Sequence, residues 1–383
     1  GRSETSRQRE QRRRASLCAH TAIDCLPEGL VAGGDARVDT VILDYANPCY
    51  SAPNPERWRR ALADVPFVVT TSPFLDESCD EVADLVLPEH TYLERFEDAA
   101  ATAVEPLYDT RATGDVIIDL AKAIGGTVAE AFPWKGFRYA FAQRALGIHR
   151  AQRGSIVASS PKAFFRDLFR EGFWAEDPAF GAPVEPSFST PSGRFEFAPE
   201  HLRTAILAHA ERTGLSVAET LGSLGLPSDL DRACLPHVYP ERVGPDRGVP
   251  QLRLDAYRPA TYAEGSGANL PLLQELNLEP GRNPREATAS MAPATADSLD
   301  IADGDRVVLR AGSESLVVVV RRERGTRAGV VRVRRGGGHT AFGRFAQGRG
   351  VNPMRLVNAD TDAVGGYPHS IDSWVEVHRE KSA

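Results

Sequence analysis

Short apolar runs alternate with helical segments between residues 38 and 90, and this alternation limits the fold more than any other feature of the chain. The runs VDTVILDY and PFVVTTSPF are typical of buried strands, and residues 85–87 form a third short run. Between them lie NPERWRRALADV, whose apolar residues have roughly helical spacing, and the acidic segment DESCDEVAD. This order of strands and helices predicts a parallel sheet with crossover helices, an α/β fold.

Small or polar residues follow each predicted strand. They are Ala46-Asn47-Pro48, Thr70-Thr71-Ser72 and Pro88-Glu89-His90. Ligands of open parallel sheets bind outside the carboxyl ends of the strands, so we expect a ligand at this edge. No G-x-G-x-x-G follows any of these strands, which disfavours an ordinary nucleotide-binding α/β enzyme.

From about residue 251 the pattern becomes all-β. The runs DRVVLRA, SLVVVVRRE and GVVRVRR are rich in β-branched residues and are separated by Gly and Asp, which predicts a small closed barrel. The last run leads into RRGGGHTAFGRFAQGRGVNP, residues 334–353. Such a loop is costly to order, because glycine loses the most conformational freedom on folding. Its backbone N–H groups can approach an anion closely, so we expect a ligand here too.

Charge and composition narrow the classes of partner. The net charge of −7 argues against nucleic acid, and no apolar run is long enough to span a membrane. The five cysteines form no C-x-x-C pair and have no zinc or iron–sulfur spacing, so they predict neither a metal site nor a disulfide framework. Residues 1–25 lack an initial Met and begin with a charge run, so we expect an unassigned or disordered tail on a truncated chain.

Five segments carry a resemblance to a known family. They are ADLVLPEHTYLERFED, VEPLYDTRATGDV, TPSGRFEF, MAPATADSLDIADGDRVVL and GGGHTAFGRFAQGRGVNP. In this order they resemble the C-terminal half of the large subunit of molybdopterin oxidoreductases of the dimethyl sulfoxide reductase family. The nearest branch is that of tetrathionate, polysulfide and menaquinone reductases, and the match covers about residues 26–378.

The resemblance implies a domain order and a cofactor. An α/β domain is expected over residues 26–200, a helical or irregular linker over 201–250, and a double-psi β-barrel over 251–383. In this family two molybdopterin guanine dinucleotides surround one molybdenum, and both domains contact them. The positions that the resemblance assigns to the cofactor are Asn47, Pro48, Ser51, Thr70, Thr71, Ser72, Pro88, His90, Tyr257, Arg258, Thr261, Gly265, Asn269, His339, Thr340, Arg344 and Asn352.

The resemblance also implies a function. The chain is expected to be the C-terminal part of the catalytic subunit of a molybdenum-dependent oxidoreductase. It would exchange electrons with an iron–sulfur subunit and, indirectly, the quinone pool, in a periplasmic complex held by a membrane anchor subunit. The cysteines for a [4Fe-4S] cluster and the protein ligand to molybdenum belong to the N-terminal half of such subunits. Neither is found in this sequence, so we expect no turnover from the chain alone.

A different class of function stays open. Subunits of alternative complex III resemble the same family yet serve as cofactor-free scaffold in a quinol-oxidising assembly. The polar residues kept within GHTAFGRFAQGRGVNP favour the enzyme, because a scaffold has no need of them. We expect His90, beside Glu89 and Glu94, to be a polar residue without metal. Cys49 is expected to be a packed thiol, since no His is placed to activate it.

Overall fold

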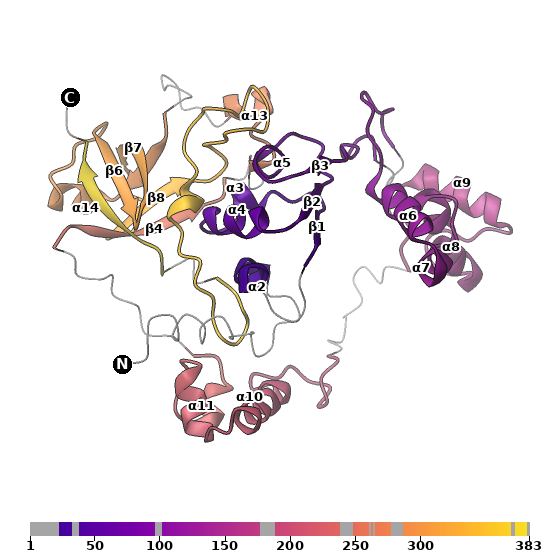
Figure 1. Cartoon of the computed structure of the whole chain (residues 1–383), viewed down its shortest axis with the longest axis horizontal. Helices are drawn as coiled ribbons and strands as arrows, with labels where there is room; N and C mark the ends of the chain where they lie inside the picture. Colours follow the sequence, from indigo (N-terminus) through magenta and orange to yellow (C-terminus); the bar gives the residue numbers. More distant parts are fainter. Residues whose placement is uncertain are drawn as a thin grey trace.

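A three-stranded parallel sheet lies at the centre of the molecule (Figure 1). The computed structural model describes residues 23–32, 38–95, 102–176, 188–237, 248–259, 262, 265–276, 286–368 and 372–380. The strands lie in the order β1 (Thr40–Leu43), β2 (Phe67–Thr70) and β3 (Leu85–Val86). The crossovers are α3 (Pro48–Ser51) and α4 (Glu56–Ala63), then α5 (Glu77–Glu81). The predicted parallel α/β sheet is therefore confirmed.

One face of the sheet is packed against α4. Trp58 and Leu62 of α4 are buried against Leu43 of β1 and Val68 of β2, which explains the helical spacing of apolar residues in that segment. The turn η1 (Ile23–Cys25) precedes α2 (Leu26–Ala32), which also packs on α4. The large apolar side chains exposed on the opposite face are Ile42, Phe67 and Leu85. Val69, which pairs with Ile42 and Leu85, is buried. Parallel sheets are normally covered on both faces, so the three exposed side chains are suited to contact with a further segment.

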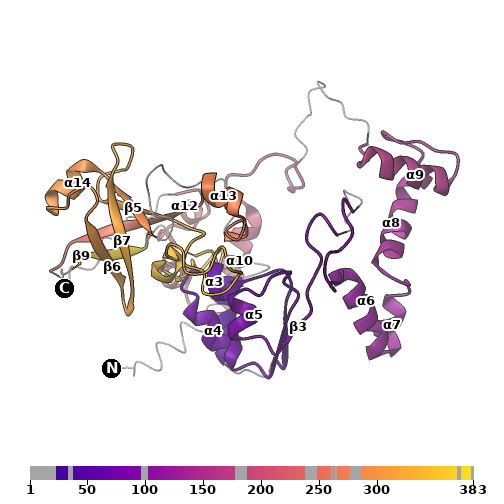
Figure 2. The ribbon, with the colours of Figure 1, turned by 90° about the horizontal axis from the view of Figure 1, so that it is seen from above.

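Two helical clusters lie outside the sheet and the barrel. The first stands apart from both in Figures 1 and 2, whereas Val364 of the C-terminal segment packs against the second. The first contains α6 (Thr113–Ile124), α7 (Gly126–Ala131), α8 (Phe137–Ala151) and α9 (Pro161–Glu171), and the second α10 (Glu200–Thr213), α11 (Val217–Ser223) and α12 (Leu230–Ala233). The helix predicted to stop at Gly125 is confirmed as α6, and Gly125 has a positive φ of 78°. Each cluster has its own apolar core. The domain boundaries remain a prediction.

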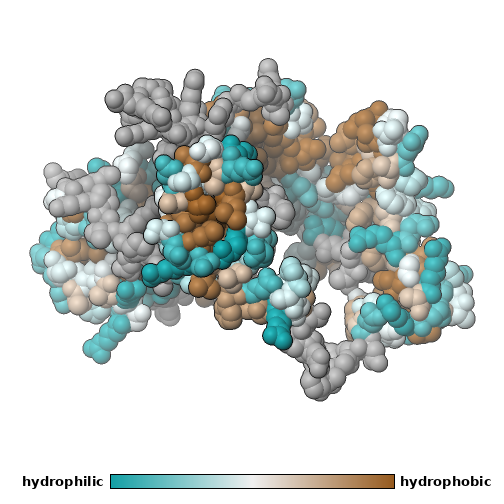
Figure 3. All heavy atoms as spheres, turned by 90° about the horizontal axis from the view of Figure 1, so that it is seen from below, coloured by the Kyte–Doolittle hydropathy of each residue, from teal (hydrophilic) through white to brown (hydrophobic). Residues whose placement is uncertain are grey.

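The helical end of the molecule exposes apolar side chains. Ile117, Leu120 and Ile124 of α6 are all exposed, and hydrophobic surface is visible over the right-hand part of Figure 3. Exposed apolar patches of this kind are typical of contact with another polypeptide. Within the described residues, no helix combines the length and the apolar character needed to cross a membrane.

Six strands close into a barrel in the order β4-β8-β5-β7-β6-β9. They are β4 (Gln251–Tyr257), β5 (Thr288–Met291), β6 (Arg306–Ala311), β7 (Glu314–Arg322), β8 (Val330–Arg334) and β9 (Trp374–Arg379), with α13 (Pro271–Leu276), α14 (Pro293–Ser298) and the turn η3 (Pro353–Leu356) in the connections. The pairs β4–β8 and β5–β7 are parallel and the others antiparallel. Alternate residues point inward, so Val307, Leu309 and Val331 are fully buried. The predicted C-terminal barrel is confirmed.

The barrel meets the sheet through the loop that follows β8. Figure 2 shows this loop beside α3 and α5. The backbone N–H of Phe342 donates to the carbonyl of Leu75, and the N–H of Asn54 donates to the carbonyl of Met354. Phe342 also packs with Phe74. The glycine-rich loop thus lies against the carboxyl end of β2, where the sequence predicts a ligand.

Candidate functional site

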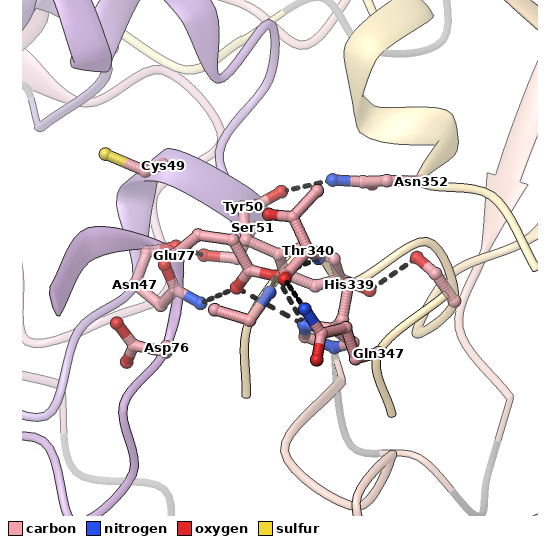
Figure 4. A network of polar contacts seen from close by, with 12 residues as sticks. Asn47, Cys49, Tyr50, Ser51, Asp76, Glu77, His339, Thr340, Gln347 and Asn352 are labelled. Carbon is pink, nitrogen blue, oxygen red and sulfur yellow. Dashed lines mark hydrogen bonds and ion pairs between the residues drawn. The ribbon is translucent and has the colours of Figure 1, made fainter. Parts of the chain in front are cut away.

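Polar side chains from three segments meet where the glycine-rich loop touches the sheet (Figure 4). Asn47 follows β1 and precedes α3, Glu77 is the first residue of α5, and His339 lies in the loop after β8. The two arms of that loop are joined by hydrogen bonds from Gly338 N–H to the carbonyl of Arg349 and from Gly348 N–H to the carbonyl of His339. These two hydrogen bonds fix the backbone conformation of the loop where it contacts the sheet.

The carboxylate of Glu77 is the centre of this cluster. It accepts hydrogen bonds from His339 Nδ1 at 3.0 Å, Thr340 N at 2.8 Å and Asn47 Nδ2 at 2.8 Å, with Ala341 N at 3.3 Å. Its side chain is only 2% exposed. Burial acts to raise the pKa of Glu77, but the hydrogen bonds from His339 and Asn47 outweigh it and lower the pKa to about 2. Glu77 is therefore an ionised carboxylate at neutral pH.

The imidazole of His339 is fixed on both faces. Its ring stacks on Tyr50 at 3.7 Å between centroids and on Phe342 at 4.8 Å. Since an ionised carboxylate only accepts, Nδ1 carries the proton donated to Glu77. His339 is 3% exposed, and its Nε2 has no hydrogen-bond partner among the described residues. Leaving a buried polar atom unpaired costs about 1–3 kcal/mol, so this nitrogen is a candidate ligand contact.

Two asparagines hold the surrounding backbone. Asn47 Oδ1 accepts from both the N–H and the hydroxyl of Ser78, so its amide nitrogen must face Glu77. Asn352 Nδ2 donates to the carbonyl of Tyr50 at 2.8 Å, and the Tyr50 hydroxyl donates to the carbonyl of Gly337. Burial and the nearby charge of Glu77 both raise the pKa of Tyr50, which therefore stays protonated.

Two clefts flank the glycine stretch. The first, of about 250 Å³, is lined by residues that include Tyr50, Glu77, Gly338, Thr340 and Asn352. The second is lined by Tyr262, Ala268, Gln274, Arg334, Gly336, Gly337, Ala346, Arg349 and Gly350. Enclosed small-molecule sites typically measure roughly 300–1,000 Å³, so the first cleft suits one end of a large ligand. The second cleft is narrow, with a volume of about 30 Å³.

Comparisons with known proteins identify this architecture. Residues 256–372 match the family described as molydopterin dinucleotide binding domain. The chain is 26% identical to the menaquinone reductase molybdopterin-binding-like subunit of Nitratidesulfovibrio vulgaris, over 88% of this chain and 41% of that protein. It is 24% identical to the arsenate respiratory reductase molybdopterin-containing subunit of Shewanella sp. strain ANA-3, over 84% of this chain and 41% of that protein. These matches support the resemblance of the chain to the C-terminal region of large subunits of the dimethyl sulfoxide reductase family.

A solved structure of a member of this fold agrees. Acetylene hydratase from Pelobacter acetylenicus superposes with a TM-score of 0.63 over 93% of this chain and 46% of that chain, at 18% identity. At this identity the likeness shows the fold alone. The chain spans about two fifths of the length of the curated relatives that it matches. The resemblance predicted from the five segments is confirmed, as is the α/β sheet followed by a barrel.

The structure brings the predicted residues after β1 into the cluster around Glu77. Asn47 bonds to Glu77 directly, and Pro48 is the buried first residue of α3. The hydroxyl of Ser51 donates to the carbonyl of Asn47 at 2.9 Å. Cys49 between them is fully buried, and burial raises the pKa of its thiol to about 11, as suits a packed residue.

The predicted residues after β2 lie beside the cluster, but their side chains form hydrogen bonds with other residues of the chain. All three are buried. The pairs are Thr70 Oγ1 with Cys79 Sγ at 3.1 Å, Thr71 Oγ1 with Asp44 Oδ1 at 2.7 Å, and Ser72 Oγ with Asp76 Oδ2 at 2.8 Å. These bonds fix the turn into α5, so this strand end shapes the site by placing Glu77.

The predicted residues after β3 contact a different part of the chain. His90 Nδ1 lies 2.6 Å from the hydroxyl of Thr110, and the carbonyl of the exposed Pro88 accepts from the N–H of Arg111. The structure thus joins Pro88 and His90 to the segment before α6 and not to the loop after β8. In the described part of the chain, no three His, Cys, Asp or Glu residues gather as a metal site would require.

The predicted barrel residues divide into two groups. Gly265, Thr340 and Asn352 lie in the cluster, and Asn269 beside it accepts from the N–H of Phe345. The others lie apart from it: Tyr257 at the end of β4 carries the guanidinium of Arg332 on its ring, Arg258 is exposed, and Arg344 is exposed over the ring of Phe345. Thr261 is outside the described residues.

Contacts within the chain itself explain why glycine is needed at positions in the loop. A Cβ on Gly338 would lie 2.3 Å from the backbone nitrogen of Asn352, and one on Gly343 would lie 2.4 Å from the amide of Asn269. Both glycines have a positive φ. The sequence suggests that glycines in this loop allow the backbone to approach an anionic ligand closely. In the structure they are required for the packing of the loop on its own chain.

Sequence reasoning missed Glu77 and Tyr50. Glu77 is one of several acidic residues in DESCDEVAD, and only its position as the first helical residue after a ligand-facing strand end distinguishes it. Tyr50 lies two residues beyond the predicted Pro48. On sequence grounds either Arg344 or Arg349 could pair with a phosphate, and of these two Arg349 lines the second cleft.

Proposed function

We propose that this chain binds one end of a molybdopterin guanine dinucleotide, as part of a bis-molybdopterin cofactor with molybdenum, at the junction of sheet and barrel. The observation that carries the proposal is His339 Nε2, a buried ring nitrogen that has no partner among the described residues. His339 directly follows Gly338, which lines the first cleft, while Gly336 and Gly337 line the second. A pterin or a guanine offers N–H donors that fit such an acceptor. The match to a molydopterin dinucleotide binding domain supports this choice.

The residues present fit the charged part of the ligand as well. Arg334 and Arg349 line the second cleft beside Gly336, Gly337 and Gly350. Guanidinium groups pair well with phosphate oxygens, and each such contact contributes about 1.5–3 kcal/mol. Arg349 also donates to the side chain of Gln274, which orients it. We therefore assign the pyrophosphate to Arg349 and not to the exposed Arg344.

The chain then serves as part of the catalytic subunit of a molybdenum-dependent oxidoreductase. When bound, the molybdenum group supplies exchange of two electrons or of an oxygen or sulfur atom with substrate. The residues of this chain bind the dinucleotide, orient its heterocycle through His339 and exclude water through the Tyr50 and Phe342 rings. A second polypeptide region would supply the [4Fe-4S] cluster and the protein ligand to the metal.

We further propose a respiratory setting. The names of the relatives, menaquinone reductase and arsenate respiratory reductase, support electron exchange with an iron–sulfur subunit and the quinone pool. A periplasmic complex with a membrane anchor subunit fits such a role. The exposed apolar residues of α6 and of the sheet are suited to contact with these further polypeptides.

The test is chemical analysis of the complex purified from a host that makes the cofactor. Molybdenum is measured by mass spectrometry, and guanine nucleotide is released by acid and quantified. We expect both in the complex, and we expect His339→Ala combined with Arg349→Ala to lose them, while Arg344→Ala keeps them. A complex without molybdenum or guanine nucleotide would refute the proposal.

A second function has an observation in its favour. The side chains of Thr70, Thr71, Ser72 and Asn352 are satisfied within the chain, and one relative is named molybdopterin-binding-like. These facts fit a cofactor-free structural subunit of a quinol-oxidising complex, similar to that of alternative complex III. The same analysis separates the two, because a scaffold assembles with its partners yet contains no molybdenum.

A further inference from the structure

The glycine-rich loop already holds an anion, and that anion belongs to the chain itself. The N–H groups of Thr340 and Ala341 and Nδ1 of His339 point to one carboxylate, that of Glu77. Successive N–H groups converging in this way form the kind of concave site that binds phosphate in other proteins. In this structure the position is filled by a side chain of α5, so an anionic group of a ligand has to bind elsewhere.

The carboxylate also joins parts of the chain that are far apart in sequence. Asn47 after β1 supplies a fourth donor, and its own orientation is fixed by Ser78. Glu77 therefore bonds to the end of one strand and to a loop 262 residues later. Because the side chains of Glu77 and His339 are each only 2% exposed, water cannot replace these hydrogen bonds unless the contact between the loop and α5 opens.

The hydrogen bond to Glu77 also determines which ring nitrogen His339 can present to a ligand. With Nδ1 committed to the carboxylate, the ring is held with its other nitrogen, Nε2, toward Gly265. The stacking rings of Tyr50 and Phe342 prevent the imidazole from turning over. A neutral imidazole in this tautomer presents Nε2 as an acceptor.

We propose that Glu77 is a positioning residue that orders the glycine-rich loop from within and holds His339 with Nε2 ready to accept a hydrogen bond from a heterocyclic N–H donor. The ordering of the loop is independent of any ligand. The use of Nε2 rests on the proposed function, and its ligand class is the pterin or guanine part of the dinucleotide.

The test compares Glu77→Gln with Asp80→Asn in the full chain within its complex. Glu77→Gln keeps the volume but presents an NH₂ group to donors on either side, whereas Asp80 is an exposed residue of the same helix. Nitrogen NMR of ¹⁵N-histidine protein, assigned with His339→Gln, reports the tautomer. Hydrogen exchange of a peptide covering residues 336–352 reports the order of the loop, and released guanine nucleotide reports binding.

We expect the wild type and Asp80→Asn to show a protonated Nδ1, a bare Nε2 and slow exchange at Thr340 and Ala341. Glu77→Gln should mix the tautomers, speed exchange of these amides about a hundredfold and lower the guanine nucleotide content. An unchanged tautomer and unchanged exchange in Glu77→Gln would overturn the proposal. Changed tautomer and exchange with full guanine content would overturn the use of Nε2 by the ligand.

Two further results keep the outcomes distinct. If Glu77→Gln does not fold, Glu77→Asp keeps the charge with a shorter reach, and we expect it to fold with faster exchange at Thr340 and Ala341. Exchange as slow as in the wild type would then count against the proposal. If the wild-type complex contains no guanine nucleotide, the proposed function fails, while the tautomer and exchange measurements still decide whether Glu77 orders the loop.

Discussion

Replacing Glu77 by Gln should remove a large share of the stability of the contact between sheet and barrel. The pKa of Glu77 is lowered from 4.5 to about 2 in the folded protein. A carboxylate held in this way contributes about 3 kcal/mol at neutral pH. Leaving a buried hydrogen-bonding group without its partner costs about 1–3 kcal/mol in other proteins, and several donors lose theirs here, so the two figures agree.

The sign of the pH dependence follows from the lowered pKa. The contribution of Glu77 is fully present above about pH 4.5, and it is lost as the pH falls through the folded value near 2. The difference between wild type and Glu77→Gln should therefore be large at pH 7 and should shrink between pH 4.5 and 2. The other titratable groups that face this carboxylate, His339 and Tyr50, are the same in wild type and Glu77→Gln, so the difference between the two proteins reports on Glu77.

Native-state hydrogen exchange measures this difference where it arises. A loss of about 3 kcal/mol corresponds to roughly a 150-fold fall in the protection of the Thr340 and Ala341 amides at pH 7. Amides of the barrel core, such as that of Val307, should change much less. Equal protection in wild type and Glu77→Gln at pH 7, or a difference that grows on acidification, would refute the reasoning.

Three further substitutions test other parts of the site. Gly338→Ala should lower the free energy of unfolding of the barrel by at least about 3 kcal/mol in a urea titration, because the added Cβ meets backbone atoms. Gly348 has a similar positive φ but open space around its Cα, so Gly348→Ala should lower the same free energy by about 1–2 kcal/mol. Arg349→Ala should lower the guanine nucleotide content of the purified complex at least about tenfold, and equal loss in Arg344→Ala would contradict the assignment. Tyr50→Phe removes one buried hydroxyl bond and should cost about 1 kcal/mol of stability without releasing the nucleotide.

The elements that could be predicted from sequence are those whose residues carry a local signal. β2 and β7 are β-branched runs bounded by turn residues, and α6 ends at a glycine with positive φ. β5 (TASM) mixes small polar with apolar residues, so nothing local distinguishes it from a loop, whereas β9 (WVEVHR) alternates apolar and polar residues but is a single short run. Their strand conformation depends on pairing with β7, β8, β4 and β6, which is a non-local effect.

The candidate site shows the same limit. Asn47 and His339 could be selected from sequence because a strand end and a glycine-rich loop mark them. Glu77 could not be separated from Asp80 and Glu81, since all three are acidic residues of one short helix. What makes Glu77 different is that it is buried against donors of a distant loop, and this is decided only when the chain folds.

The position of Glu77 finally limits which ligands suit the junction. Because the N–H groups of Thr340 and Ala341 are occupied, a phosphate cannot bind beside His339 without displacing a buried carboxylate. Phosphate contacts are left to Arg334 and Arg349 in the second cleft, on the far side of the glycine stretch. A ligand that uses both His339 Nε2 and these arginines must carry its heterocycle at a distance from its phosphates. That requirement favours a dinucleotide over inorganic phosphate, which can satisfy only one of the two sites.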